Sequence, residues 1–326
     1  MIDLARWIAP FIDPSFVLHS RSHELSNFGS TSSWFVKRDD ELSFGVCGCK
    51  YRKYSSLLHH IKSQGIQKVA LVGSAFSNHI VGLLQLLHEK KIDYHLYLRK
   101  PRDEDLQGNH LLIQMLSCKE KRTYLDETAW KNKDTLIPSW IDADTLYIPE
   151  GGLCLPSLYG AMTLAHDIDL NQTFLNLEFD HIFIDAGSGM SAIGLILGLA
   201  ILEQYKPVHI ILTYYDPDFF KTQLTYFHQQ LSAALGTFLK LPPLHLEPSS
   251  LGKAFGSTPQ AVYEKIGSLA KDQGILTDPI YSAKLFATAQ ELDEKHHFSG
   301  NKLIIHSGGA LALWGFLDPL KKHLKL

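Results

Sequence analysis

Lys50 is the first residue whose type and setting could carry chemistry. It stands in GVCGCKYRKY, residues 45–54, where Arg52 and Lys53 follow it closely. A desolvated lysine near other cations loses its proton readily and forms Schiff bases with carbonyl compounds. Most lysines are solvated surface residues, however, so the stretch by itself favours a plain turn before a helix.

Cys47 and Cys49 form a C-x-C pair in the same stretch. A metal site would need further Cys or His ligands at a useful spacing, and Cys118 and Cys154 each stand alone. We therefore predict no metal site and interpret the pair as small residues in a tight loop. Four cysteines in a chain of this length are not a disulfide framework, which favours a reduced, cytoplasmic protein.

A glycine loop, DAGSGMSAIG at residues 185–194, follows an expected strand and opens an expected helix. Glycines let the backbone approach a ligand closely, and the free N–H groups of a helix start favour an anion. The hydroxyls of Ser188 and Ser191 suit a phosphate that lies against this helix start. The loop therefore predicts a phosphate site.

The same loop leaves a second interpretation open. Gly187, Gly189 and Ala192 satisfy the dinucleotide spacing G-x-G-x-x-A, and Asp216 is a late candidate for binding a ribose. A nicotinamide oxidoreductase is therefore an alternative. The chain has no G-x-x-x-x-G-K-[ST] at this loop, which excludes a P-loop there.

Three hydrogen-bonding side chains, Ser77, Asn78 and His79, end the stretch GSAFSNH at residues 73–79. Ser and Asn are common N-caps, so one of them would be explained by helix capping. Three in a row after a strand make helix capping alone a weaker explanation. His79 has no evident acid or nucleophile partner in the sequence, and no G-x-S-x-G occurs, so we predict no hydrolase triad.

Short apolar runs and amphipathic stretches alternate from residue 67 onward, as in a mostly parallel sheet covered by helices. Gly, Pro and Ser near 152–160 mark the expected crossing between two α/β units. Ligands bind outside the carboxyl ends of such strands, where the loops described above lie. The expected strands are 68–73, 93–99, 181–187, 208–215 and 302–309, together with a strand that runs into a glycine turn within 145–152. The expected helices are 79–91, 109–117 and 191–205.

Composition narrows the function classes. The chain has 326 residues, 34 acidic and 31 basic, with a net charge of −3. This balance gives no electrostatic case for a nucleic-acid partner. The start of the chain lacks the pattern of a signal peptide, and the longest apolar run, 192–202, is far too short to span a bilayer.

Six motifs in one order resemble the pyridoxal-phosphate family of 1-aminocyclopropane-1-carboxylate (ACC) deaminases and D-cysteine desulfhydrases. The resemblance extends from about Pro10 to Phe316. It implies an α/β architecture of fold type II, similar to the tryptophan synthase β chain, with two open, mostly parallel twisted sheets. A small domain at 54–155 would sit between the two parts of a large one, 1–53 and 156–326. The motifs are KRDD, GCKYRK, SNH, GSGMS, LTDPIYSAK and HSGG, which start at residues 37, 48, 77, 187, 276 and 306.

The resemblance also implies roles for single residues. Lys50 would carry pyridoxal 5'-phosphate as a Schiff base and later move protons. Asn78 would contact the cofactor's 3-hydroxyl oxygen, while Ser77, with His79 beside it, would face the substrate. Tyr281 would stack near the substrate. Ser307 would face the pyridine nitrogen and leave it largely neutral. The phosphate would be held by the backbone of Gly187, Ser188, Gly189, Met190 and Ser191.

Several residues depart from the family pattern. Cys49 replaces an asparagine before the lysine, and Met190 and Ser191 stand where the family has G-T. Phe255 takes the place of a tyrosine in a G-Y-G segment. Ser282 replaces the glutamate that deaminases have after the tyrosine matched to Tyr281. The missing glutamate is closer to the desulfhydrase pattern.

The leading hypothesis is therefore a pyridoxal-phosphate lyase that eliminates the thiol of D-cysteine or a relative. An ACC deaminase is the alternative within the class, and a non-catalytic, cofactor-binding relative is the alternative outside it. We expect a cytoplasmic homodimer that binds a small amino acid and neither nucleic acid nor membrane.

Overall fold

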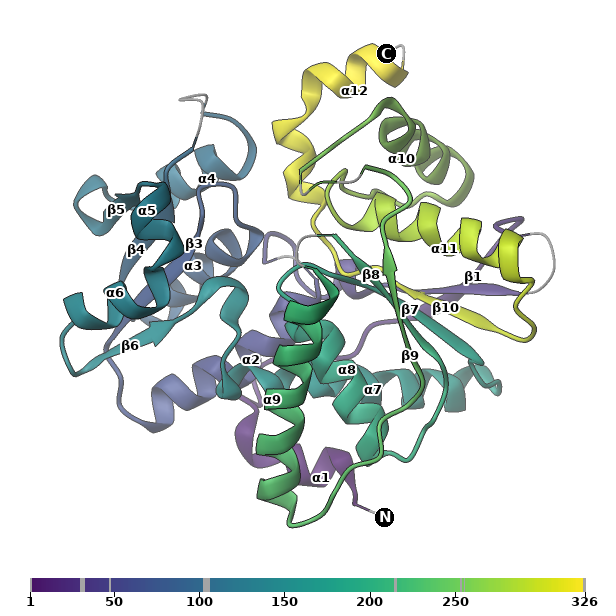
Figure 1. Ribbon diagram of the computed structural model, residues 1–326, viewed down its shortest axis with the longest axis horizontal. Coiled ribbons are helices and arrows are strands. Elements are labelled where there is room, and N and C mark those ends of the chain that lie inside the picture. Colours follow the sequence, from purple (N-terminus) through teal and green to yellow (C-terminus); the bar gives the residue numbers. More distant parts are fainter. Residues whose placement is uncertain are drawn as a thin grey trace.

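The computed structural model describes residues 2–29, 33–46, 48–101, 106–213, 216–252, 254 and 256–324. Its strands form two separate sheets (Figure 1). The six-stranded sheet has the order β1-β2-β10-β7-β8-β9, and the four-stranded sheet has the order β5-β4-β3-β6. Only the β1–β2 pair is antiparallel among these strands. The predicted α/β class with two mostly parallel sheets is confirmed.

The strand bounds show how the chain is divided between the sheets. The larger sheet consists of β1 (Ser22–Leu25), β2 (Trp34–Lys37), β7 (His181–Ala186), β8 (Val208–Leu212), β9 (Leu244–Pro248) and β10 (Lys302–Ile305). The smaller sheet consists of β3 (Lys68–Ser74), β4 (Asp93–Arg99), β5 (Arg122–Leu125) and β6 (Thr145–Ile148).

Helices cover both faces of each sheet. Their bounds are α1 (Leu4–Ile8), α2 (Cys49–Ser63), α3 (Asn78–Lys90), α4 (Gly108–Leu116), α5 (Glu127–Lys131), α6 (Lys133–Trp140), α7 (Leu155–Leu175), α8 (Met190–Ile201), α9 (Pro217–Leu235), α10 (Gln260–Gln273), α11 (Ser282–His296) and α12 (Leu317–Leu324). Short 3-10 turns are η1 (Ala9–Phe11), η2 (Asp39–Glu41), η3 (Lys119–Lys121), η4 (Glu150–Gly152) and η5 (Ala310–Gly315). No helix in these ranges is both long enough and apolar enough to cross a bilayer.

The two-residue period of a strand explains the helical layers. Ile182 and Ile184 of β7 pack into the core formed with α7, α8 and α9, whereas Phe183 between them packs into the core formed with α11. The smaller sheet also has a separate core on each face, with α2 and α3 on one face and α5 and α6 on the other. Strands buried on both faces read as continuous apolar runs, which is why they were recognisable in the sequence.

Helix α2 joins the two halves. Cys49 at its start belongs to the core of the larger sheet, while Leu57 and Leu58 belong to the core of the smaller one. We therefore place the residue boundaries of the two domains at 1–53 with 156–326, and at 54–155, as a proposal. Figure 1 shows the smaller sheet with its helices on the left and the larger one on the right.

Several predicted elements end earlier in the structure, including the strand expected at 302–309, which ends at Ile305. The strand expected at 145–152 stops at Ile148 because Pro149 has no N–H to donate, and η4 follows. The helix expected at 191–205 ends at Ile201, with Leu202 as its C-cap. The strand expected at 208–215 ends at Leu212, and residues 214 and 215 lie outside the described residues.

Candidate active site

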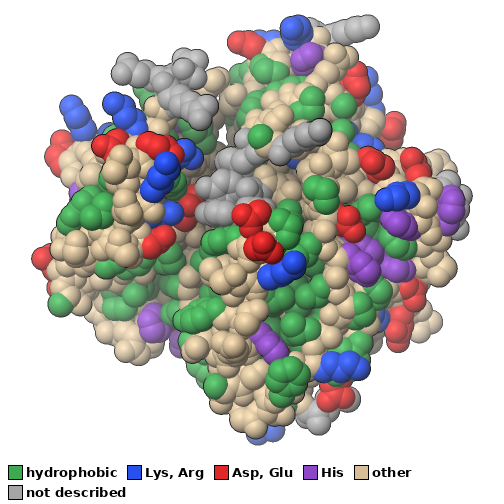
Figure 2. All heavy atoms as spheres, viewed as in Figure 1, with side chains coloured by type: hydrophobic (Ala, Val, Ile, Leu, Met, Phe, Trp, Pro, Cys, Tyr) green, Lys and Arg blue, Asp and Glu red, His purple; other side chains and the backbone are tan. Residues whose placement is uncertain are grey.

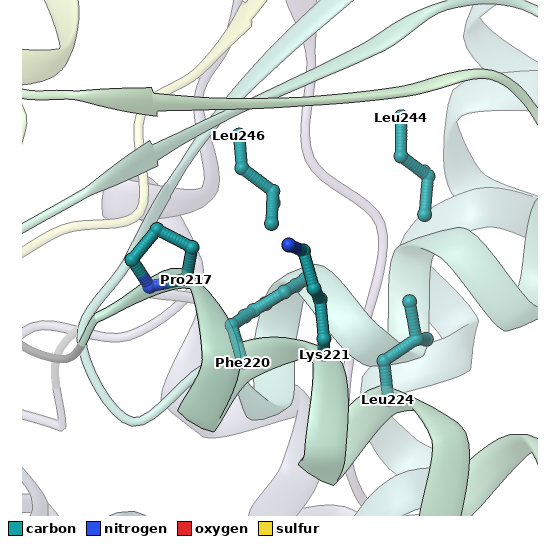
Figure 3. A pocket seen from close by; sticks show the side chains of 6 residues that line it. All are labelled: Pro217, Phe220, Lys221, Leu224, Leu244 and Leu246. Atoms are coloured by element: carbon teal, nitrogen blue, oxygen red, sulfur yellow. The ribbon is translucent and has the colours of Figure 1, made fainter.

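Two cavities differ in what they could bind. The smaller, about 460 Å³, lies between α9 and the edge strand β9 and is walled by five apolar side chains, with Lys221 as its one charged side chain (Figure 3). The larger, about 690 Å³, lies between the two sheets and is rich in hydroxyl, amide and ammonium groups. Chemistry requires convergent polar groups, so the larger cavity is the candidate active site.

Loops from the carboxyl ends of both sheets meet at this cavity, as expected for parallel sheets. Residues 74–79 follow β3, residues 99–101 end β4, residues 185–191 end β7, and Ser307 follows β10. The predicted site residues Lys50, Ser77, Asn78, His79, Gly187, Ser188, Gly189, Met190, Ser191, Tyr281 and Ser307 all line it. Cys47 and Phe255 lie outside the described residues.

Lys50 stands in the first turn of α2 and points toward Tyr281. Its Nζ lies 5.7 Å from the centre of the Tyr281 ring. The backbone before this turn packs directly against Ser307. Gly48 has a φ of 56°, and any Cβ on it would overlap the Ser307 carbonyl oxygen. The Cys49 N–H donates to that same oxygen at 3.1 Å. The lysine and Ser307 are therefore held on one rigid backbone junction.

A buried ion network anchors the start of α2. Arg52 donates to Asp39 through Nε at 2.6 Å and Nη2 at 2.7 Å, and to Asp167 of α7 at 2.6 Å. Lys37 of β2 also donates to Asp167, at 2.5 Å. Burial alone would raise the pKa of Asp39, but the charge and hydrogen bonds of Arg52 outweigh burial and lower it to about 2.

This network corrects the expectation about Arg52 and explains the departure from the family pattern at Cys49. Arg52 was expected to be part of the cationic surroundings of Lys50, but its guanidinium is committed to Asp39 and Asp167 instead. Cys49 is buried, and its thiol donates to Asp39 at 3.1 Å. Burial, followed by the charge of Asp39, holds the pKa of this thiol well above its usual value, so Cys49 is a packing residue.

Ser77 and Asn78 open helix α3 at the cavity wall. The Ser77 Oγ accepts from the N–H groups of His79 at 3.2 Å and Ile80 at 3.3 Å, so Ser77 is an N-cap and a cavity residue at once. The Oδ1 of Asn78 accepts from Nδ2 of Asn109 at 2.7 Å. Asn109 lies on α4, also lines the cavity and fixes the Asn78 amide, a role with no signal in the sequence.

His79 is buried and neutral. Its Nδ1 lies 2.9 Å from the hydroxyl of Tyr54, and its Nε2 has no hydrogen-bond partner among the described residues. Burial, followed by the charges of Lys53 and Lys50, holds the pKa of His79 well below its usual value. The Nε2 side of the ring thus remains available to a ligand.

Helix α8 presents an uncapped N-terminus to the cavity. Gly189 has a φ of 94°, and no side chain accepts from the first N–H groups of the helix. A Cβ on Gly151 of η4 would overlap the Ser188 hydroxyl, so the two loops close on each other only because position 151 is glycine. An uncapped N-terminus of a twelve-residue helix favours an anion.

Lys53 adds a cation beside this helix start. It lies one turn after Lys50 on α2, lines the cavity, and donates to the carbonyl of Gly151 at 2.5 Å. Burial, with the charge of Lys50 second, lowers the pKa of Lys53 to about 7. The sequence suggested Lys53 only as part of the surroundings of Lys50. The i, i+3 spacing of the two lysines is the signal that places them on one face of the helix.

Asp278 positions Tyr281 at the opposite wall. Its carboxylate accepts from the N–H groups of Ile280 at 2.8 Å and Tyr281 at 2.9 Å, and from the Ser282 hydroxyl at 2.7 Å. Ser282 is fully buried in these bonds. The residue directly after Tyr281 is thus Ser282, which supplies a buried hydroxyl and not a carboxylate.

These features fit pyridoxal phosphate. A lysine that could form the covalent bond and an uncapped helix start with a neighbouring cation for the phosphate line one cavity. Two further polar atoms, Nε2 of His79 and Oδ1 of Asp185, are buried there without protein partners among the described residues. Once bound, this cofactor supplies an electron sink for negative charge at the α-carbon of an amino acid.

Comparisons with known proteins agree with the site. A Pyrococcus horikoshii protein assigned as an ACC deaminase is 29% identical over 297 residues, covering 88% of this chain and 87% of its own. A bifunctional D-cysteine desulfhydrase/ACC deaminase of Arabidopsis thaliana is 27% identical over 308 residues, covering 89% and 75%. The crystal structure of an ACC deaminase homologue superposes with a TM-score of 0.85, 25% identity and coverage of 99% and 100%. No family model matches the chain.

Fold and site together define a pyridoxal-phosphate-dependent enzyme of fold type II. Within this class, the chain is related over nearly its whole length to the ACC deaminases and D-cysteine desulfhydrases. The resemblance seen in the ordered motifs is confirmed.

Proposed function

We propose that this enzyme catalyses α,β-elimination on a small amino acid, with D-cysteine as the leading candidate substrate. The observation that carries the proposal is the position of Lys50, which lies in one cavity with Ser77 and Asn78 on one side and Tyr281 on the other. The Arabidopsis relative is named for both candidate reactions. The lack of a carboxylate directly after Tyr281 favours elimination over ring opening.

The chain's own residues have the following proposed roles. Lys50 binds the cofactor and removes the α-proton. Ser77, Asn78 and His79 hold the substrate carboxylate, and Asn78 also contacts the cofactor's 3-hydroxyl oxygen. Tyr281 covers the substrate side of the cavity. The phosphate is bound by the backbone from Gly187 to Ser191, including Ser188, Gly189 and Met190, and Ser307 faces the pyridine nitrogen.

The overall reaction balances without a further reagent except water. The α-proton goes to Lys50, and the bond between the β-carbon and sulfur breaks with its electron pair on the sulfur. Sulfide and 2-aminoacrylate leave. Water then hydrolyses the 2-aminoacrylate to pyruvate and ammonia.

An amino-acid panel tests the proposal. Purified protein loaded with pyridoxal phosphate should release sulfide and pyruvate in equal amounts from D-cysteine, and less of both from L-cysteine. D-serine should give less pyruvate than D-cysteine does, and no sulfide. Release of 2-oxobutyrate from ACC, without sulfide from D-cysteine, would favour the ring-opening deaminase instead. Absence of any keto acid across the panel would contradict elimination and favour a non-catalytic relative.

Lys53 gives a pH-dependent prediction. Its pKa of about 7 rises when a phosphate binds beside it, because an anion favours the ammonium form. Phosphate binding therefore takes up a proton above pH 7, and affinity should fall as pH rises, by at most about tenfold per pH unit for one proton. Calorimetry of sulfate binding to cofactor-free protein, in buffers of different ionisation enthalpy, measures this uptake, because sulfate mimics the phosphate group but does not itself titrate near pH 7.

Lys53→Met should abolish the proton uptake. Lys62→Met is the matched control, because Lys62 lies exposed on the same helix. Proton uptake that persists in Lys53→Met would place the titrating group elsewhere.

The oligomer and the location of the protein also belong to this proposal. We propose a homodimer in the cytoplasm. In support, Cys49, Cys118 and Cys154 are free thiols, as in a reducing compartment. Large apolar side chains such as Trp314 and Met115 are exposed, which supports the proposed homodimer. Acidic and basic side chains are interspersed on the face in Figure 2. Sedimentation equilibrium would measure the oligomeric state.

A further inference from the structure

Asp185 is a buried acid that the proposed function does not yet use. It is the penultimate residue of β7, lines the active-site cavity and is 9% exposed. Its Oδ1 has no hydrogen-bond partner among the described residues. Its neighbours Ile184 and Ala186 are apolar and pack into the core of the larger sheet. Nothing in the sheet itself calls for a carboxyl group at this position.

The sheet register places Asp185 beside Ser307. Strands β7 and β10 are parallel neighbours, with Phe183 opposite Ile304. Two residues further along each strand, Asp185 comes level with His306, directly before Ser307. Burial raises the pKa of Asp185, while the Ser307 hydroxyl and the charge of Lys50 oppose that shift. The carboxyl group therefore lies at the end of the cavity that the Ser307 hydroxyl also faces.

An unpartnered oxygen on a buried carboxyl is costly, so such groups are normally bonded to something. The cavity offers room for a ligand, and the missing partner is a hydrogen-bond donor. In the proposed site, Lys50, Asn78 and the start of α8 account for the aldehyde, the 3-hydroxyl and the phosphate of the cofactor. The polar atom of the ring that remains is its nitrogen, which becomes a donor when it is protonated.

We propose that Asp185, together with Ser307, accepts a hydrogen bond from the protonated pyridine nitrogen of the bound cofactor. This inference rests on the proposed cofactor site and deepens it. It replaces the expectation that a hydroxyl alone leaves the nitrogen largely neutral. A carboxylate at this position keeps the nitrogen protonated, as acidic partners do in other pyridoxal-phosphate enzymes, and this strengthens the electron sink. Asp185 would then contact the cofactor directly.

Two readouts independent of turnover test the inference. The first is the ¹⁵N NMR signal of ring-labelled pyridoxal phosphate bound to the wild-type enzyme, which should be that of a protonated nitrogen. The second is the affinity of cofactor-free enzyme for pyridoxal phosphate, compared with its analogue that has C–H in place of the ring nitrogen. A hydrogen bond to a charged group corresponds to a preference of roughly 10- to 100-fold for the natural cofactor.

Asp185→Asn should shift the NMR signal toward the neutral ring and reduce the preference to a few-fold. Asp144→Asn, at an exposed acid away from the cavity, is the matched control and should behave as wild type. The wild-type spectrum still tests whether the ring nitrogen is protonated, even if Asp185→Asn does not fold. Failure of wild type to bind the cofactor would overturn the proposed function and this inference with it. Covalent binding through Lys50 with a neutral ring nitrogen in wild type, or an unchanged preference in folded Asp185→Asn, would overturn the inference alone.

Discussion

Lys50→Ala is expected to abolish turnover and the absorbance band of lysine-bound pyridoxal phosphate. In the proposed reaction Lys50 both attaches the cofactor and moves the α-proton. The loss should therefore reach or exceed the roughly 10⁴-fold upper range of acid–base catalysis. Absorbance titration with pyridoxal phosphate and a keto-acid assay with D-cysteine measure the two effects. Inorganic phosphate should still bind, because Lys53 and the start of α8 remain.

Two further variants make this result specific. Lys62→Ala, an exposed lysine on the same helix, should retain both the band and the activity. Lys50→Arg keeps the positive charge but has no amine that forms a Schiff base at neutral pH, so it should lose both. An unchanged absorbance band in Lys50→Ala would show that another lysine binds the cofactor.

Arg52→Met is expected to give the largest loss of stability. Arg52 is 1% exposed and neutralises Asp39 and Asp167 together. Breaking a buried ion pair by removing one partner costs about 3–5 kcal/mol, because the remaining charges stay buried without compensation. Urea unfolding of wild type and variant measures this difference. Lys68→Met, which removes an exposed pair with Asp142, is the control and should change stability by less than about 1 kcal/mol.

The same network sets the acid limit of the fold. Asp39 has a pKa of about 2 in the folded protein, below the ordinary value of about 3.9. Its contribution to stability is therefore complete above pH 4 and is lost as pH falls through about 2. In Arg52→Met, stability should depend less steeply on pH between 4 and 2. An equal pH dependence in both proteins would show that other carboxylates dominate acid unfolding.

The sequence alone predicted much of the fold. Strands such as β3 and β7 are buried on both faces, so their residues form continuous apolar runs that local reading detects. The short strands β1, β2, β5 and β9 were not predicted. Strands β1 and β5 each bury a single residue and β9 buries none, so pairing with a neighbouring strand defines these three rather than their own pattern.

The candidate site was predicted as a set of loops and motifs. Lys50, Ser77, Asn78 and the 187–191 loop were found because their residue types and their order along the chain carry the signal. The pairing of those loops in one cavity follows from the carboxyl ends of parallel strands, which is a general rule. For this reason the cavity contains the predicted residues that the structure describes.

Only the tertiary structure revealed the partners that tune these residues. Arg52 and Asp167 are 115 positions apart in the chain, and no local pattern predicts that the guanidinium turns away from Lys50 toward that carboxylate. Lys53 is an ordinary helical lysine until burial beside Lys50 lowers its pKa to about 7. In the sequence, Asp185 is only a residue near the end of an expected strand. The pairing of β7 with β10 places Ser307 beside it. Residue types and their order are written in the sequence, whereas burial and long-range contacts, which set charge and protonation, arise only when the chain is folded.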